Sequence, residues 1–187
     1  MQQGKSKNKG NNAEREVSKK LSLWWTNNER DDVFWLTSLS GGRATQRLKS
    51  NKKTHNSASD IGYIDEIGKP LIDFAVIEIK RGYNKLLDLL SIIDGKKNGK
   101  PTILLQWFTK AKQEAVEDNR PCVLLIIRRD YKEYCIIIDY KHAKKIQFQA
   151  NKSPSNFIMY KNDFIIMSFE EFLSWCKPQY VKAILSK

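Results

Sequence analysis

The chain has 187 residues, and its 33 lysines and arginines outnumber its 21 aspartates and glutamates, which gives a formal net charge of +12. A chain of this length buries enough surface to fold without disulfides or a structural metal, and a hydrophobic fraction of 41% excludes a disordered chain. The excess of positive charge favours polyanionic partners, of which nucleic acid is the foremost candidate.

Other features of the composition bear on the compartment. No apolar run approaches the roughly 20 residues of a membrane-spanning helix, and the polar, basic N-terminus lacks the apolar core of a signal peptide. The three cysteines are an odd number and lie far apart in the chain, which favours free thiols over a disulfide framework or a zinc site. We therefore expect a cytoplasmic protein that does not associate with membranes.

The spacing of apolar side chains predicts the first elements. Residues 1–12 are polar and basic, and we expect them to form a flexible tail. A helix is predicted from about Asn12 to Thr26, because apolar side chains recur at helical spacing: Ala13, Val17, Leu21, Trp24 and Trp25. Aromatic and branched residues predict a short strand over 32–37. Residues 38–59 are predicted to be a long functional loop, in which no acidic residue balances the basic ones: Arg43, Arg47, Lys49, Lys52 and Lys53.

Two strands come next, and we expect them to pair as a hairpin. The first covers residues 60–65, and the second is the apolar run 71–80, which is typical of a buried central strand. Further along, the pattern predicts helices over 84–94, 102–119 and 169–176 and strand hairpins within 122–139 and 157–167. This order predicts an α/β fold with a single mixed β-sheet flanked by helices.

Charged residues at the end of the second strand are the strongest indication of chemistry. Side chains alternate along a strand, so Glu78 and Lys80 point the same way. If the two strands form a hairpin, Asp60 lies beside them, and Glu14 supplies a third acid from the first helix. Carboxylates hold Mg²⁺ through hard oxygen ligands, the metal activates water, and a lysine can orient the water or neutralise phosphate oxygens. This set predicts metal-dependent phosphodiester hydrolysis.

The ordered combination resembles a known family. Ser59-Asp60 followed by Glu78-Ile79-Lys80 resembles the PD-(D/E)xK nuclease signature, although Ser59 stands in place of the proline. The segment from Lys9 to Val17, KGNNAEREV, is similar to the K-G-x-x-x-E-R-E start of archaeal-type and phage Holliday junction resolvases. The resemblance implies a restriction-endonuclease-like nuclease core over 13–139, followed by a C-terminal extension, 140–187, that packs on the same domain.

The resemblance also implies functional residues and partners. Glu14, Asp60, Glu78 and Lys80 would be catalytic, and the three acids with the backbone carbonyl of Ile79 would hold Mg²⁺, for which Mn²⁺ can substitute. The substrate would be branched or duplex DNA rather than a small molecule, the protein a homodimer, and its setting a bacterial, archaeal or phage-infected host cell. We expect DNA contacts from basic residues near these motifs: Lys9, Arg15, Arg43, Arg47, Lys49, Lys52, Lys53 and Arg81.

Alternatives remain at this stage. Glu16 lies about 200° around the helix from Glu14, so the two cannot face one site; geometry alone does not choose between them, and the resemblance chooses Glu14. The foremost function is a structure-selective, resolvase-like DNA endonuclease. A nicking, homing or restriction-type endonuclease that cuts duplex DNA is the second, and a non-catalytic nucleic-acid-binding module is the third.

Overall fold

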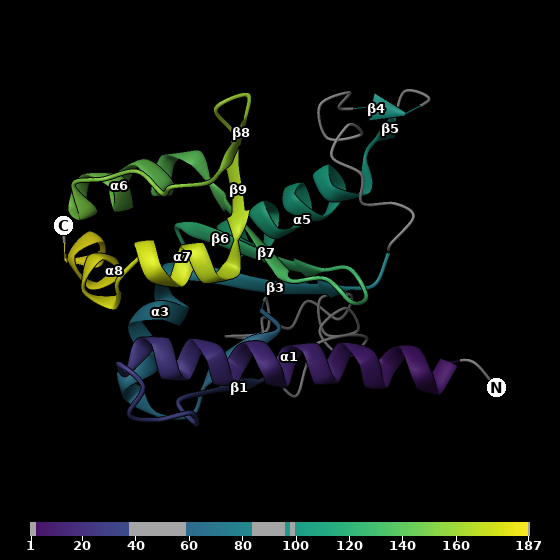
Figure 1. Ribbon diagram of the computed structural model, residues 1–187, viewed down its shortest axis with the longest axis horizontal. Coiled ribbons are helices and arrows are strands. Elements are labelled where there is room, and N and C mark those ends of the chain that lie inside the picture. The colour runs from purple at the N-terminus through teal and green to yellow at the C-terminus, as the bar shows by residue number, and fades with distance from the viewer. Residues whose placement is uncertain (1–2, 38–58, 84–95, 98–99, 187) are drawn as a thin grey trace.

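In the part of the chain that the structure describes, the main sheet has five strands and carries helices on both faces. The computed structural model describes residues 3–37, 59–83, 96–97 and 100–186. The strand order is β3-β6-β7-β9-β8, with the β3–β6 pair parallel and the remaining pairs antiparallel (Figure 1). The strand bounds are β3 Ala75–Arg81, β6 Cys122–Arg128, β7 Tyr134–Asp139, β8 Ile158–Tyr160 and β9 Phe164–Ser168. The prediction of an α/β fold with a mixed sheet flanked by helices is therefore confirmed.

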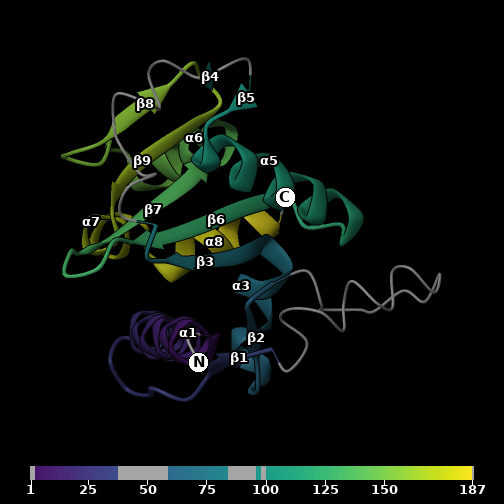
Figure 2. The same ribbon diagram turned by 90° about the vertical axis from the view of Figure 1, so that its right-hand side faces the viewer.

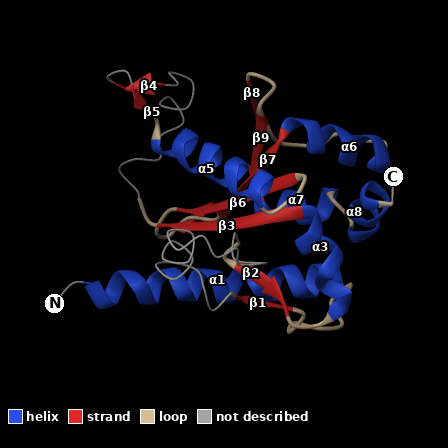
Figure 3. Ribbon diagram, turned by 180° about the vertical axis from the view of Figure 1, so that it is seen from behind, coloured by secondary structure: helices blue, strands red, loops and turns tan. Residues whose placement is uncertain are grey.

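Two long helices cover opposite faces of this sheet. Helix α1 (Gln3–Trp25) lies on one side of β3 and helix α5 (Ile103–Glu117) on the other (Figure 3). The apolar residues of β3 alternate between the two cores, since Ile77 and Ile79 pack with the α1 side and Val76 packs with the α5 side. By the same alternation, Glu78 and Lys80 emerge on the side of α5.

A smaller two-stranded sheet lies beside α1. Its strands, β1 (Phe34–Leu36) and β2 (Ile61–Tyr63), pair antiparallel, and Figure 2 shows them next to α1 on the same side of the main sheet. A third pair, β4 (Lys96–Lys97) with β5 (Lys100–Pro101), precedes α5. The strand predicted within 32–37 is thus present, whereas the helix predicted over 84–94 lies outside the described residues.

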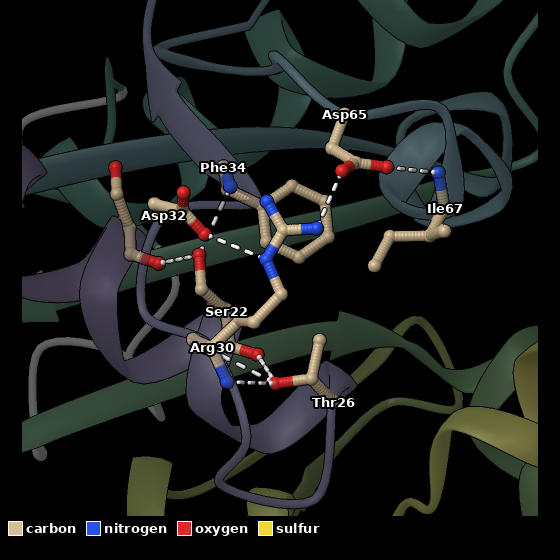
Figure 4. A network of polar contacts seen from close by, with 8 residues as sticks. Ser22, Thr26, Arg30, Asp32, Phe34, Asp65 and Ile67 are labelled. Carbon is tan, nitrogen blue, oxygen red and sulfur yellow. Dashed lines mark hydrogen bonds and ion pairs between the residues drawn. The ribbon is translucent and has the colours of Figure 1, made fainter.

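Polar contacts fix the end of α1 to this small sheet (Figure 4). The Arg30 guanidinium donates to Asp32 at 2.9 Å and to Asp65 at 2.5 Å. The backbone N–H of Phe34 donates to the Ser22 hydroxyl at 2.9 Å. These bonds hold β1 and the end of β2 against α1, so the helix and the segment just before β2 keep a fixed relationship.

The hairpin predicted between residues 60–65 and 71–80 is wrong. β2 pairs with β1, and the chain then forms the 3₁₀ turn η1 (Glu66–Gly68) and helix α3 (Lys69–Phe74) before β3 starts. Pro70 stands in the first turn of α3, where its missing N–H costs nothing and its fixed φ favours a helix. The first residues of the apolar run are therefore helical, and the strand begins only at Ala75.

Among the described strands, β3 lies at the edge of the main sheet and is not the central strand that its apolar sequence predicts. The short segment before β2 covers its free edge. The Ser59 hydroxyl accepts from the N–H of Ile77 at 3.0 Å, and the N–H of Asp60 donates to the carbonyl of Ile77 at 2.9 Å. These bonds satisfy backbone groups that an edge strand otherwise leaves exposed, and they place Asp60 beside β3 by a route that the sequence did not indicate.

The N-terminal boundary also differs from the prediction. Helix α1 begins at Gln3 rather than at Asn12, so it includes most of the segment 1–12 that we expected to be a flexible tail. Lysine and glutamine lose little rotamer freedom in a helix, and a helix whose apolar stripe is anchored by packing extends into such a segment with little cost.

The C-terminal part of the chain adds β8 and β9 to the main sheet and contributes three helices. They are α6 (Tyr140–Ala150), α7 (Phe169–Trp175) and α8 (Pro178–Leu185). The hairpins predicted within 122–139 and 157–167 and the helix predicted over 169–176 are present, whereas α6 and α8 were not predicted. Phe172, Trp175 and Val181 belong to the same apolar cluster as Val17 and Leu21 of α1. Within the described ranges, no helix is both long and apolar enough to cross a membrane.

Candidate active site

The carboxyl group of Asp60 lies against the free edge of β3. Its Oδ2 atom accepts a hydrogen bond of 2.8 Å from the backbone N–H of Ile79. Burial, and after it the negative charge of Glu78, raise the pKa of Asp60 to about 7, although the positive charge of Lys80 acts in the opposite direction. Asp60, Glu78 and Lys80 therefore form one electrostatic group at the end of β3, although not through the hairpin that the sequence predicted.

Glu78 and Lys80 form an ion pair within this group. The Lys80 ammonium lies 2.5 Å from the Oε2 atom of Glu78, and the side chains are 26% and 11% exposed, respectively. Burial disfavours the charged form of Lys80, but the charges of Glu78 and Asp60 outweigh burial and raise the pKa of Lys80. The lysine is thus held protonated in a partly buried position.

Glu14 reaches the same group from helix α1. Burial raises the pKa of Glu14, the Lys80 charge lowers it and the Glu78 charge raises it. Its Oε2 atom is buried and has no hydrogen-bond partner among the described residues. A buried carboxylate oxygen without a partner is costly, and a bound cation would remove that cost.

Glu16 has a different position, which separates it from Glu14. Its Oε2 atom accepts from the Arg128 guanidinium at 2.8 Å and from the Tyr134 hydroxyl at 3.0 Å. Glu16 therefore ties α1 to strands β6 and β7, on the flank opposite to Glu14. The geometry of the folded chain thus places Glu14, and not Glu16, with Asp60 and Glu78.

A fourth acid, Glu114 on helix α5, was missed by the sequence reasoning. Its Oε1 atom lies 2.8 Å from the Lys110 ammonium, and its side chain is 22% exposed. Burial raises the pKa of Glu114; the Lys110 hydrogen bond lowers it, and the Glu78 charge raises it further. Glu114 sits beside the apolar stripe of its helix, but nothing local in the sequence indicates that this flank crosses the end of β3.

Of the predicted DNA-contacting residues, Arg15 and Arg81 have side chains within the described part of the chain. Arg15 is exposed on α1, and the half-buried Arg81 has its Nε atom 3.9 Å from Asp130. Lys9 lies on α1, but its side chain is outside the described part of the chain. The basic residues of the predicted loop lie outside the described residues as well: Arg43, Arg47, Lys49, Lys52 and Lys53.

A comparison with protein-family models matches residues 5–183 to the family described as "Phage putative PDDEXK endonuclease". The chain belongs to this family. Membership in the phage PDDEXK endonuclease family confirms the PD-(D/E)xK resemblance, and the match runs past residue 139 into the C-terminal helices. Comparisons with curated proteins and with solved structures give no match.

The donor set of this candidate site suits a hard divalent cation. Glu14, Asp60 and Glu78 offer carboxylate oxygens, which are the ligands that Mg²⁺ and Mn²⁺ prefer. The buried, unpartnered oxygen of Glu14 is the observation that favours a cation here. The residues present therefore fit the metal that the resemblance implies.

Cys122, Asp139 and His142 form a separate group of potential ligand atoms, all within 4.8 Å of one another. The Asp139 carboxylate caps helix α6, because its Oδ1 atom accepts from the backbone N–H of His142 at 3.0 Å and contacts the His142 ring at 2.6 Å. Its Oδ2 atom accepts from the N–H of Val123 at 3.3 Å. These hydrogen bonds explain the group as a buried helix cap, and the group is separate from the candidate site around Asp60.

Proposed function

We propose that the protein is a divalent-metal-dependent endonuclease that hydrolyses phosphodiester bonds in DNA. The observation that carries the proposal is the meeting of Glu14, Asp60, Glu78 and Lys80 at the free edge of β3 in a member of the phage PDDEXK endonuclease family. Glu14, Asp60 and Glu78 bind the cation, Mg²⁺ or Mn²⁺. The carbonyl of Ile79, on the same strand edge as the N–H that bonds Asp60, is the backbone ligand.

Lys80 and Asp60 have different roles beside the cation. A bound cation would lower the pKa of a water molecule and stabilise charge on the phosphate. Lys80, held protonated by Glu78 and Asp60, donates hydrogen bonds to the attacking water or to a non-bridging phosphate oxygen. The hydrogen bond from the Ile79 N–H restricts the Asp60 side chain, so its ligand oxygen is preorganised for the cation.

Branched DNA is the substrate that we favour, because residues 9–17 resemble the start of resolvase-type enzymes. Symmetric cutting of two strands needs two sites, so we propose that a homodimer acts on the branch point. Arg15, Arg81 and Lys9 contact phosphates near the site, and the basic residues of 38–58 contact the flanking arms. Cleavage of linear duplex DNA is the second candidate, and the basic content of residues 38–58 favours it.

Cleavage of matched substrates tests the proposal. A labelled four-way junction, a linear duplex of the same sequence and a single strand are incubated with the protein in Mg²⁺ or in EDTA. We expect junction cleavage in Mg²⁺ and none in EDTA. Preferential cutting of the linear duplex would select the second candidate. Binding that is indifferent to Mg²⁺, without cleavage of any substrate, would select a non-catalytic binding module.

A further inference from the structure

The ion pair of Lys80 conflicts with the proposed role of Glu78. The Lys80 ammonium lies 2.5 Å from the Oε2 atom of Glu78, and this carboxylate is also one of the proposed cation ligands. An ammonium and a divalent cation on one carboxylate repel each other, and the repulsion is poorly screened because Glu78 is only 11% exposed. Loading of the cation therefore drives Lys80 away from Glu78, and the ammonium needs another acceptor.

Glu114 offers that acceptor on the same face of β3. Helix α5 packs on the side where Val76 lies, which by alternation is the side of Glu78 and Lys80. The Oε1 atom of Glu114 is held by Lys110 at 2.8 Å, and its Oε2 atom is buried without a hydrogen-bond partner in the described part of the chain. One oxygen is thus anchored while the other is free to receive a donor.

Glu114 and Lys80 lie on the same face of β3, and their charges interact. The charge of Glu114 is among the causes that raise the pKa of Lys80, after burial, which opposes it, and the nearer acids Glu78 and Asp60. The charge of Lys80 also acts on Glu14, but Glu14 comes from α1, which lies on the other face of the sheet. Glu114 comes from α5, on the face where Glu78 and Lys80 emerge, and it is therefore the acceptor that this face offers to the lysine.

We propose that Glu114 is a positioning residue that receives the Lys80 ammonium from Glu78 when a divalent cation binds. The exchange frees Glu78 for the cation and keeps Lys80 on the α5 side of the site, directed at the phosphate. Lys110 holds Glu114 in place for this exchange. The inference rests on the proposed function, because it requires Glu78 to bind a cation.

Calorimetric titration of the full-length protein with Mn²⁺, in the absence of DNA, tests whether Glu114 affects cation binding. Glu114→Gln removes the charge and keeps the size. Glu117→Gln is the matched control, because Glu117 lies on the same helix, is exposed and accepts a hydrogen bond from the exposed Gln113. We expect Glu114→Gln to weaken Mn²⁺ binding by about 10- to 100-fold, the range for residues that orient metal ligands. Glu117→Gln should bind as the wild type does.

A double-mutant cycle with Lys80→Met shows whether Glu114 acts through the lysine. Without the ammonium there is nothing to transfer, so adding Glu114→Gln to Lys80→Met should leave Mn²⁺ affinity unchanged. An equal loss in both backgrounds would overturn the inference, because Glu114 would then act on the cation itself. In cleavage assays, Glu114→Gln should lower kcat with KM for DNA unchanged.

The outcomes also distinguish this inference from the proposed function. Wild-type protein that binds Mn²⁺ and cuts DNA, with Glu114→Gln behaving in the same way, would overturn the inference alone. Wild-type protein that neither binds Mn²⁺ nor cuts any substrate would overturn the proposed function and the inference with it. Circular dichroism of each variant confirms that the fold is intact before titration.

Discussion

The Oδ2 atom of Asp60 accepts a 2.8 Å hydrogen bond from the backbone N–H of Ile79. This bond joins the segment before β2 to the free edge of β3, although the two strands are not paired with each other. The carboxylate of Asp60 and the Glu78-Ile79-Lys80 triplet are therefore held together by the backbone of an edge strand. An edge that another strand covered could not accommodate Asp60 in this way.

The Ser59 hydroxyl supports this arrangement, and its removal should weaken both the fold and the site. It bonds to the N–H and to the carbonyl of Ile77, each at 3.0 Å, in a buried position. Ser59→Ala leaves the N–H of Ile77 without its partner, so we expect the free energy of unfolding to fall by about 1–3 kcal/mol. Urea unfolding measures the loss, and Ser174→Ala, at an exposed serine, serves as the control. An unchanged stability would contradict the role of Ser59.

The raised pKa of Asp60 predicts a pH-dependent stability in metal-free protein. Its pKa is about 7 in the folded chain and about 3.9 in an unfolded chain. Between these values the folded state binds more protons than the unfolded state, so stability falls as pH rises from about 4 to 7. We expect urea unfolding in EDTA to show a loss of a few kcal/mol across this window.

Asp60→Asn isolates the contribution of this carboxyl group. The variant cannot ionise, so most of the loss between about pH 4 and 7 should disappear. A smaller loss should remain from Glu14 and Glu114, whose pKa values are also raised by burial. An equally steep loss in Asp60→Asn and wild type would contradict the assignment.

The alternation of β3 explains how much of the site could be predicted from sequence. A period of two places Glu78 and Lys80 on one side wherever the strand lies, so their grouping did not depend on the sheet order. The apolar run 71–80 was ambiguous, because a short apolar stretch suits a helix or a strand, and Pro70 was the local signal for the helix. Glu114 depends on how α5 crosses β3, which no local pattern encodes.

Glu14 and Glu16 provide a matched pair on one helix. Glu14→Gln removes a proposed cation ligand, so we expect cleavage to fall by about 10- to 100-fold while the free energy of unfolding does not decrease. Glu16→Gln weakens the contacts with Arg128 and Tyr134, which are partly exposed, so stability should fall by about 1 kcal/mol with cleavage unchanged. Cleavage assays and urea unfolding of both variants measure the contrast. Lost cleavage in Glu16→Gln alone would reverse the assignment.

Glu78 is at the centre of the proposed site, and its substitution tests that site most directly. The measurement is the cleavage rate of a labelled four-way junction and its matched duplex in Mg²⁺, for wild type, Glu78→Gln and the exposed control Glu66→Gln. If the proposed site is right, Glu78→Gln slows cleavage by about 10²- to 10⁴-fold, because the variant loses several kcal/mol of transition-state stabilisation. Glu66→Gln should cut at the wild-type rate. Cleavage by Glu78→Gln at the wild-type rate would contradict it.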